Sequence, residues 1–235
     1  MAESYFRFKN FEIHQDRCAM KVGTDGVLLG SWIQPEKNIK HILDIGTGTG
    51  LLALMLAQKS GAMIDAIDID ESSVKQASEN FSNSPWPERL KAIHCSLQQF
   101  SISAAGKYDL IVSNPPYFSD SYKTADSPRT LARHSDKSLS FEALIDGAFY
   151  LILPLKEGEL FENSASAKGL FANRITSVFT RRGKPTKRLL MSFQFLREEK
   201  ITGELVIQDD DGGFSEDYRK LTEEFYLGLK SHRQQ

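Results

Sequence analysis

The sequence predicts an α/β fold, with a mostly parallel seven-stranded sheet that has an antiparallel edge and carries helices on both faces. Three observations support this prediction. Short apolar runs alternate with helical patterns from residue 39 onward, which is typical of βαβ units. A glycine-rich turn joins the first of these runs to a helix. The last apolar runs are separated by short polar turns, which favours antiparallel pairing at one edge.

The composition is that of a soluble globular domain. The 235 residues include 40% hydrophobic and 26% charged side chains, and no run approaches the ~18 apolar residues of a membrane helix. The N-terminus lacks the apolar stretch of a signal peptide. Two distant cysteines, Cys18 and Cys95, fit neither a disulfide framework nor a metal site. We therefore expect a cytoplasmic protein without a metal ion, and nothing in the sequence requires more than a monomer.

The first half of the chain is predicted to contain four strands and two helices. Each strand is a short run of apolar residues, and each helix has the composition or the periodicity of a helix that packs on a sheet. The predicted strands span residues 39–45, 62–69, 90–95 and 108–112, and the helices span 51–58 and 71–83.

The second half begins with a polar segment, residues 118–138, which is too rich in Ser, Asp and Lys to belong to a core. A loop of this length in a compact domain is usually functional or mobile. After it we expect helices over 140–148, 156–168 and 216–230, and strands over 149–153, 174–180, 188–195 and 204–207.

The turn after the first strand is a candidate ligand-binding loop, with the sequence Asp44-Ile45-Gly46-Thr47-Gly48-Thr49-Gly50. Its glycines allow a tight turn and a close approach of the backbone to a ligand, beside a helix N-terminus that favours polar groups. The next strand ends at Asp68, 22 residues after Gly46, where a carboxylate can accept hydrogen bonds from ribose hydroxyls. Together they predict a nucleoside site.

The glycine spacing departs from the dinucleotide motif, because a leucine stands where the third glycine should be. With its preceding acid, the loop resembles motif I of the class I S-adenosylmethionine-dependent methyltransferases. This resemblance implies a Rossmann-like fold and a cofactor site that includes Asp68 and the neighbouring Ile69. Ser96 and Leu97 stand where that family often has an acid and an apolar residue beside the adenine of the cofactor. A serine carries no charge, so we expect weaker adenine recognition.

The quartet Asn114-Pro115-Pro116-Tyr117 follows the fourth predicted strand and suits methylation of a planar amino group. The lone pair of such a nitrogen is delocalised, and two acceptors aimed at its hydrogens would make it available. The Asn114 side chain and the Pro115 carbonyl can supply these acceptors, and Tyr117 can stack on the substrate. Catalysis would then rest on positioning and electrostatics. The quartet resembles motif IV of the amino-methyltransferases, whose substrates include adenine, cytosine and glutamine.

Basic residues favour a nucleic-acid acceptor, although the net charge of −2 gives no such indication. The segment 181–188 carries five positive charges in eight positions, and such a turn can bind phosphates. Acids gather elsewhere, at 209–211 and in the last predicted helix, so we expect one basic side on the surface. The candidate RNA-binding residues are Lys123, Arg129, Arg133, His134, Arg181, Arg182, Lys184, Lys187 and Arg188.

The resemblance becomes close in the segment 18–30, which looks like the N-terminal signature of the bacterial tRNA(Val) (adenine-37-N6)-methyltransferases and implies that Thr24 and Asp25 bind the cofactor. Ala132-Arg133-His134, the 184–188 turn and residues 225–227 also match. The resemblance covers nearly the whole chain and implies methylation of adenine in a tRNA anticodon loop. It also implies that residues 1–40 form a lid over the methionine end of the cofactor, before a methyltransferase domain over 41–235.

The chain departs from this family at one place. The family has a longer helix and a glycine-containing turn where Ala148 here runs almost directly into the next strand, which bears on the fifth strand and not on the cofactor site.

Four rival functions stay open at the level of the sequence. Methylation of a protein glutamine is disfavoured, because only about forty residues precede the glycine loop, without an evident helical substrate domain. The acceptor could instead be a different adenine in RNA or DNA. The chain could also be a catalytically silent binding module or a nicotinamide oxidoreductase, and the absent third glycine counts against the oxidoreductase.

Overall fold

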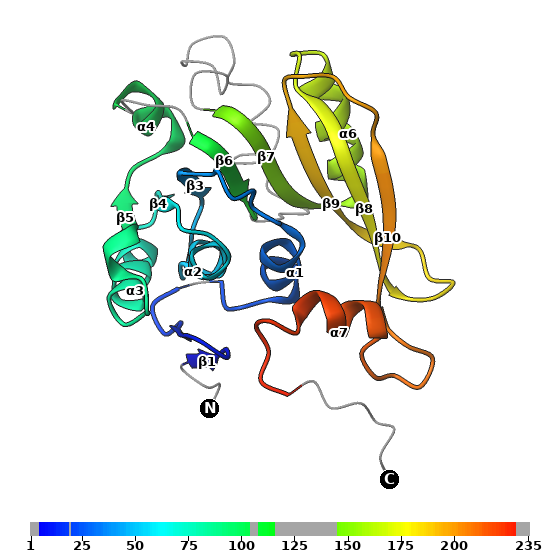
Figure 1. The fold of residues 1–235 in the computed structure, drawn as a ribbon, viewed down its shortest axis with the longest axis horizontal. Helices are drawn as coiled ribbons and strands as arrows, with labels where there is room; N and C mark the ends of the chain where they lie inside the picture. Colours follow the sequence, from blue (N-terminus) through cyan, green and yellow to red (C-terminus); the bar gives the residue numbers. More distant parts are fainter. Residues whose placement is uncertain (1–4, 19, 104–107, 116–144, 229–235) are drawn as a thin grey trace.

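The structure is a computed structural model that describes residues 5–18, 20–103, 108–115 and 145–228 (Figure 1). Within these residues the main sheet has eight strands, one for each of the eight predicted strand segments and one more than the seven of the predicted fold class. Their order across the sheet is β10 (Ile201–Gln208), β8 (Phe171–Arg181), β9 (Thr186–Gln194), β7 (Ile145–Pro154), β6 (Tyr108–Ser113), β3 (His41–Ile45), β4 (Met63–Asp68) and β5 (Leu90–His94).

The sheet is mostly parallel, as predicted. Strands β5, β4, β3, β6 and β7 run in one direction, and β9 pairs antiparallel to both β7 and β8. The antiparallel strand therefore lies inside the sheet, two positions from the edge. The outermost strand β10 is parallel to β8. After β9 the chain crosses over β8, and β10 then pairs with β8 on the side away from β9.

Helices cover both faces of this sheet, as predicted. One face carries α1 (Thr24–Trp32), α2 (Leu51–Lys59), α3 (Glu71–Ser82) and α7 (Glu216–Thr222), and the other carries α4 (Leu97–Ser103) and α6 (Leu155–Ser166). Successive strand residues point to opposite faces, so Ile42 packs in the first core and Leu43 in the second, and both are fully buried. Burial on both faces explains why the strands read as continuous apolar runs.

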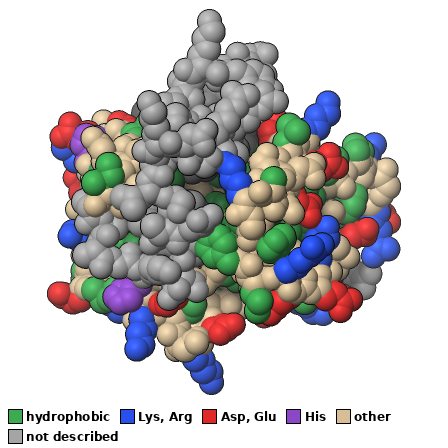
Figure 2. Space-filling view, turned by 90° about the horizontal axis from the view of Figure 1, so that it is seen from above, with side chains coloured by type: hydrophobic (Ala, Val, Ile, Leu, Met, Phe, Trp, Pro, Cys, Tyr) green, Lys and Arg blue, Asp and Glu red, His purple; other side chains and the backbone are tan. Residues whose placement is uncertain are grey.

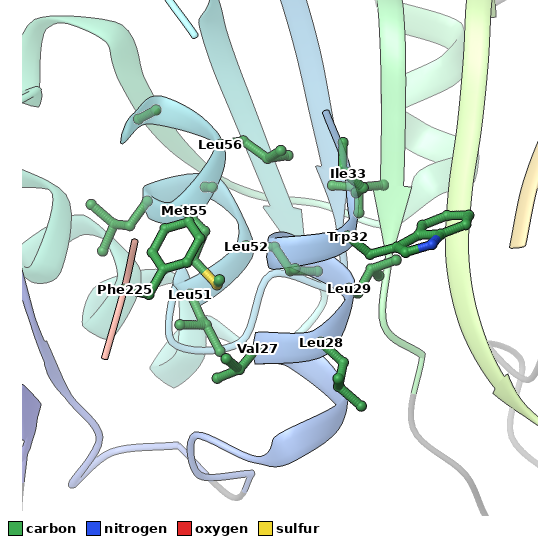
Figure 3. Close-up of a cluster of buried hydrophobic side chains, with 14 of the residues drawn as sticks. Val27, Leu28, Leu29, Trp32, Ile33, Leu51, Leu52, Met55, Leu56 and Phe225 are labelled. Atoms are coloured by element: carbon green, nitrogen blue, oxygen red, sulfur yellow. The ribbon is translucent and has the colours of Figure 1, made fainter. Parts of the chain in front are cut away.

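The helix α1 is not among the predicted elements. It packs its Val27, Leu28 and Leu29 side chains into the core beside α2 (Figure 3). Its apolar residues surround the helix and lack an amphipathic period, and glycines interrupt them. At Gly30 an added Cβ would lie 2.5 Å from the Met55 sulfur, so this glycine permits the close approach of α1 and α2. The lid role of residues 1–40 stays a prediction, and the structure adds that α1 contributes to the core.

The predicted helix over 140–148 is wrong for its second half, because residues 145–148 belong to β7; residues 140–144 lie outside the described part. No residues are left for a turn between Ala148 and Phe149, so sheet pairing extends back toward Ile145. The extension includes a register shift: Ile145 faces Tyr108, whereas Ala148 faces Leu110. The predicted strand over 149–153 is confirmed as the second half of β7.

The remaining strands and helices predicted from residue 39 onward are present, with ends shifted by a few residues, except at the last helix. The sequence predicts that helix over 216–230, but α7 ends at Thr222. The chain turns there because Phe225 folds inward and is fully buried, and its carbonyl accepts a hydrogen bond from the Lys9 backbone N–H at 2.8 Å. A small antiparallel pair, β1 (Tyr5–Arg7) and β2 (Glu12–His14), precedes α1, and a 3-10 turn, Pro87–Arg89, precedes β5.

Candidate methyltransferase site

Three of the predicted site features, the glycine loop, Asp68 and Asn114, lie at the carboxyl ends of three neighbouring strands. In the sheet Ile45 of β3 pairs with Ile67 of β4 on one side and with Ser113 of β6 on the other. The glycine loop, Asp68 and Asn114 therefore leave the sheet at the same edge. In an open parallel sheet this edge is where ligands bind.

The glycine loop holds its backbone open on one side. Gly46 and Gly48 have φ values of +71° and +57°, and a Cβ on either would meet no atom of the described residues within 4 Å. On the other side the loop is anchored, since the N–H groups of Gly46 and Thr47 donate to the Ile67 carbonyl at 2.9 and 3.1 Å. Gly50, with φ +84°, precedes α2. The predicted close approach of a ligand to this backbone is therefore sterically possible.

Asp68 joins the second strand to the glycine loop. Its Oδ2 accepts the Gly48 N–H at 2.9 Å, and its Oδ1 accepts the Asp70 N–H at 3.0 Å. The carboxylate is half-buried, and each oxygen has room in its lone pairs for a further donor. The orientation of this carboxylate is thus fixed by two backbone groups.

Asp44 lies fully buried beneath the loop. Its Oδ2 accepts the Thr47 hydroxyl at 2.7 Å, whereas its Oδ1 has no hydrogen-bond partner within the described residues. Burial raises the pKa of the Asp44 carboxyl to about 7, and the Thr47 hydroxyl and the Ala53 backbone offset part of this effect. A buried acceptor without a partner is costly unless a ligand supplies a donor.

Asn114 is half-buried directly after β6, and Pro115 is buried. The Ser113 hydroxyl donates to the Ile45 carbonyl at 2.9 Å, which fixes the end of β6 to the end of β3. The first turn of α1 lies beside Asn114, because a Cβ on Gly26 would come within 3.6 Å of the Asn114 Nδ2. Pro116 and Tyr117 lie outside the described residues.

Gly26 is a site residue that the sequence did not single out, although it lies within the predicted signature 18–30. An added Cβ there would also lie 2.9 Å from Leu51 Cδ2, so a larger residue would push α1 from both α2 and Asn114. Of the two residues in this turn that are predicted to bind the cofactor, Thr24 is exposed and Asp25 is half-buried.

The residues predicted to flank the cofactor adenine follow β4 and β5. Ile69 is 55% exposed, which leaves an apolar surface beside Asp68. Ser96 caps α4, since its hydroxyl accepts the Gln99 N–H at 3.2 Å and its own backbone N–H donates to Gln99 Oε1 at 3.1 Å. This is a capping box, and its Ser-x-x-Gln pattern is visible in the sequence. Leu97 begins α4 and is half-buried.

A second residue that the sequence did not single out, Asn80 of α3, supports the glycine loop from below. Its Nδ2 donates to the carbonyl oxygens of Thr49 and His14 at 2.8 and 2.9 Å, and its Oδ1 accepts the His14 N–H at 2.9 Å. Asn80 is 1% exposed, so these contacts tie the loop and the N-terminal segment to α3. A lone asparagine within a helix carries no sequence signal of this role.

The basic segment 181–188 forms the β8–β9 hairpin. Arg181, Arg182, Lys184 and Lys187 are exposed, whereas Arg188 is half-buried and its Nε lies 2.8 Å from Asp25 Oδ2. Lys123, Arg129, Arg133 and His134 lie outside the described residues.

The prediction that the acids gather away from these basic residues is wrong for the 209–211 turn. Gln208 pairs with Arg181 across β10 and β8 and accepts a hydrogen bond from its Nε at 3.0 Å. The acidic turn therefore begins beside the hairpin. On the face drawn in Figure 2, Lys and Arg side chains are interspersed with Asp and Glu.

In the described part of the chain, no group of three or more His, Cys, Asp and Glu side chains could hold a metal ion. Among the described helices, none is both long enough and apolar enough to cross a membrane.

Solved structures support the fold. A predicted O-methyltransferase from Agrobacterium tumefaciens matches with a TM-score of 0.65 at 17% identity, over 86% of this chain and 96% of that one. A putative rRNA methylase from Clostridium thermocellum matches with a TM-score of 0.56 at 14% identity, over 74% of this chain and 99% of that one. M. capricolum TrmK, solved with S-adenosyl-homocysteine, matches with a TM-score of 0.53 at 12% identity, over 78% of this chain and 71% of that one.

Sequence comparisons identify the family. The model of the methyltransferase small domain matches residues 19–151. A tRNA1(Val) (adenine(37)-N6)-methyltransferase from Bacteroides fragilis is 44% identical, over 97% of this chain and 100% of its own length. A protein of the same name from Flavobacterium psychrophilum is 45% identical, over 95% of this chain and 100% of its own length. The chain therefore belongs to the tRNA1(Val) (adenine(37)-N6)-methyltransferase family.

Proposed function

We propose that this protein transfers a methyl group from S-adenosylmethionine to the exocyclic N6 of adenine 37 in a tRNA(Val). The observation that carries the proposal is the position of Asn114 and Pro115, directly after β6 and at the same sheet edge as the open glycine loop and Asp68. The names of relatives at 44–45% identity supply the tRNA and the adenine.

The described residues fit this cofactor. S-adenosylmethionine supplies an electrophilic methyl group on a sulfonium. The open backbone at Gly46 and Gly48 leaves room for it, and Asp68 can accept hydrogen bonds from the ribose hydroxyls. The Oδ1 of Asp44 offers a buried acceptor without a partner among the described residues, which matches the ammonium of the methionine end. The exposed Ile69 offers an apolar surface for the adenine.

The chain itself prepares the acceptor nitrogen. Asn114 Oδ1 and the Pro115 carbonyl would accept the two amino hydrogens of adenine, which turns the nitrogen lone pair toward the methyl group. Their rigidity matters, because positioned dipoles need no reorganisation during the reaction. The Ser113–Ile45 hydrogen bond, the burial of Pro115 and the proximity of Gly26 to Asn114 all support such rigidity.

A tRNA would approach from the side of the exposed hairpin residues Arg181, Arg182, Lys184 and Lys187. Anticodon-loop bases can leave the stack and enter a pocket without melting of a duplex. We infer that the protein does this as a monomer in the cytoplasm, with residues 1–40 over the methionine end of the cofactor and residues 41–235 as the methyltransferase domain.

The experiment uses tritiated S-adenosylmethionine with a tRNA(Val) transcript, a transcript that carries G at position 37, and a release factor as a protein acceptor. We expect N6-methyladenine only in the first. Label in the release factor, or no methyladenine in any transcript, would overturn the proposal.

The variant Asn114→Ala tests the acceptor role. We expect loss of transfer with cofactor affinity retained in calorimetry, whereas Asn83→Ala, at an exposed asparagine after α3, serves as the matched control with full activity. Full activity of Asn114→Ala would refute the proposed role of this residue.

A further inference from the structure

One basic residue of the hairpin differs from its neighbours. Arg181, Arg182, Lys184 and Lys187 are exposed, but the Arg188 side chain is 28% exposed and forms an ion pair with Asp25, which is 25% exposed. The Arg188 Nη1 also donates to the Lys187 carbonyl at 3.0 Å. The guanidinium is thus directed inward, toward α1, instead of outward with the rest of the hairpin.

The two partners belong to elements that are anchored in different ways. Arg188 lies in β9, where it pairs with Pro154 of β7 and with Val178 of β8. Asp25 is the second residue of α1. The N-cap of this helix is Gly23, so no side chain caps its first backbone N–H groups. An uncapped helix end frays easily. The ion pair therefore ties the first turn of α1, which has no side-chain cap, to a strand that is paired on both sides.

This helix start is next to the proposed chemistry. Gly26 follows Asp25, and its missing Cβ would lie 3.6 Å from the Asn114 Nδ2. Any outward movement of the first turn of α1 opens space beside the Asn114 side chain. A displacement of about 1 Å at a reacting centre can cost up to about a hundredfold in rate.

We propose that Arg188 is a positioning residue, which holds the first turn of α1 against Asn114 through its ion pair with Asp25. This inference rests on the proposed function, and it differs from the phosphate-binding role expected from the sequence. A phosphate contact and a positioning contact have different signatures. Loss of one phosphate contact weakens tRNA binding and lowers the slope of log K against log salt by about 0.9 for a duplex. Loss of a positioning contact lowers kcat.

The experiment compares Arg188→Ala, Asp25→Ala and the double variant with Lys184→Ala, an exposed residue of the same hairpin. We expect Arg188→Ala to lower kcat by about ten- to a hundredfold, with the KM for tRNA and the salt slope unchanged. The kcat of the double variant should equal that of the more impaired single variant, because both changes remove the same Asp25–Arg188 ion pair. Arg188→Lys should restore part of kcat. Lys184→Ala should raise KM and flatten the salt slope at constant kcat.

Hydrogen exchange gives a readout that does not depend on activity. We expect faster exchange of the amides of residues 26–29 in Arg188→Ala, with α2 unchanged. If the wild type methylates no tRNA, the proposed function fails, and this measurement still decides whether Arg188 holds α1. A rise in KM and a flatter salt slope for Arg188→Ala, as for Lys184→Ala, would overturn the inference. Unchanged exchange at residues 26–29 would overturn it as well.

Discussion

The ring of Phe81 lies directly against Gly50, where a Cβ would come within 2.5 Å of the Phe81 Cε1. Gly50 also has φ +84°, so an alanine there combines a steric clash with an unfavourable backbone. We expect Gly50→Ala to lower the free energy of unfolding by about 2–4 kcal/mol in urea denaturation. Gly61→Ala is the control, because a Cβ there meets nothing within 4 Å and its φ is not positive. Equal stability of the two variants would contradict the packing of α3 on the loop.

A substitution at Gly48 should affect cofactor binding separately from the stability of the fold. Gly48→Ala introduces backbone strain of about 1–2 kcal/mol, since its φ is +57°, and it places a methyl group in the open space above the loop. Gly183→Ala in the hairpin has similar strain, with φ +72° and open space, but lies away from the loop. We expect similar melting temperatures for the two variants, and loss of S-adenosylmethionine binding in calorimetry for Gly48→Ala alone. Normal binding by Gly48→Ala would argue against ligand approach to this backbone.

Asp44 predicts a pH dependence of stability. Its pKa is raised from 3.8 to about 7 by burial, so folding favours the neutral carboxyl. This contribution is fully present below pH 3.8 and is lost as the pH rises through about 7. We therefore expect the ligand-free wild type to lose stability relative to Asp44→Asn across this window, followed by a constant difference above it. Urea denaturation at several pH values measures this, and a difference independent of pH would contradict it.

The close contact between β6 and β7 predicts a sensitive position far from the ligand. A Cβ on Gly147 would lie 1.9 Å from the Asp109 carbonyl oxygen, at the register shift between these strands. We expect Gly147→Ala to destabilise the protein by about 3 kcal/mol or more, because backbone cannot yield as a side chain can. Gly203→Ala on the edge strand β10 is the matched control, with an ordinary contact of 3.5 Å. Thermal unfolding compares them, and equal melting temperatures would refute the contact.

The parts of the site that follow from local sequence were predictable. The glycine loop, Asp68 and Asn114 each stand directly after a short buried strand, and parallel pairing alone brings such positions to one edge. The ion pair between Asp25 and Arg188 joins residues 163 positions apart, and no local pattern indicates it. From the sequence, Arg188 is therefore indistinguishable from the remaining charges of the hairpin.

The incorrect elements have physical causes of a different kind. Residues 145–148 belong to a segment predicted as helix, but continuity with Phe149 leaves no room for a turn, and Ile145 and Gly147 are themselves weak helix formers, so the segment pairs in the sheet. The helix α1 has no amphipathic period, because it is buried around most of its circumference and lacks a polar stripe. The end of α7 is set by the burial of Phe225, which depends on residues near the start of the chain.

The contact between Lys9 and Phe225 has a consequence for biosynthesis. The first core contains side chains from α1 and α2 and also Tyr218 and Phe225, so this half of the interior closes only after residue 225 has left the ribosome. At about 5–20 residues per second, the apolar surfaces of α1 and α2 wait roughly 10–40 s for their last partners. We therefore expect ribosome-bound chains halted before residue 216 to remain sensitive to protease at α1, whereas released full-length chains should be protected there.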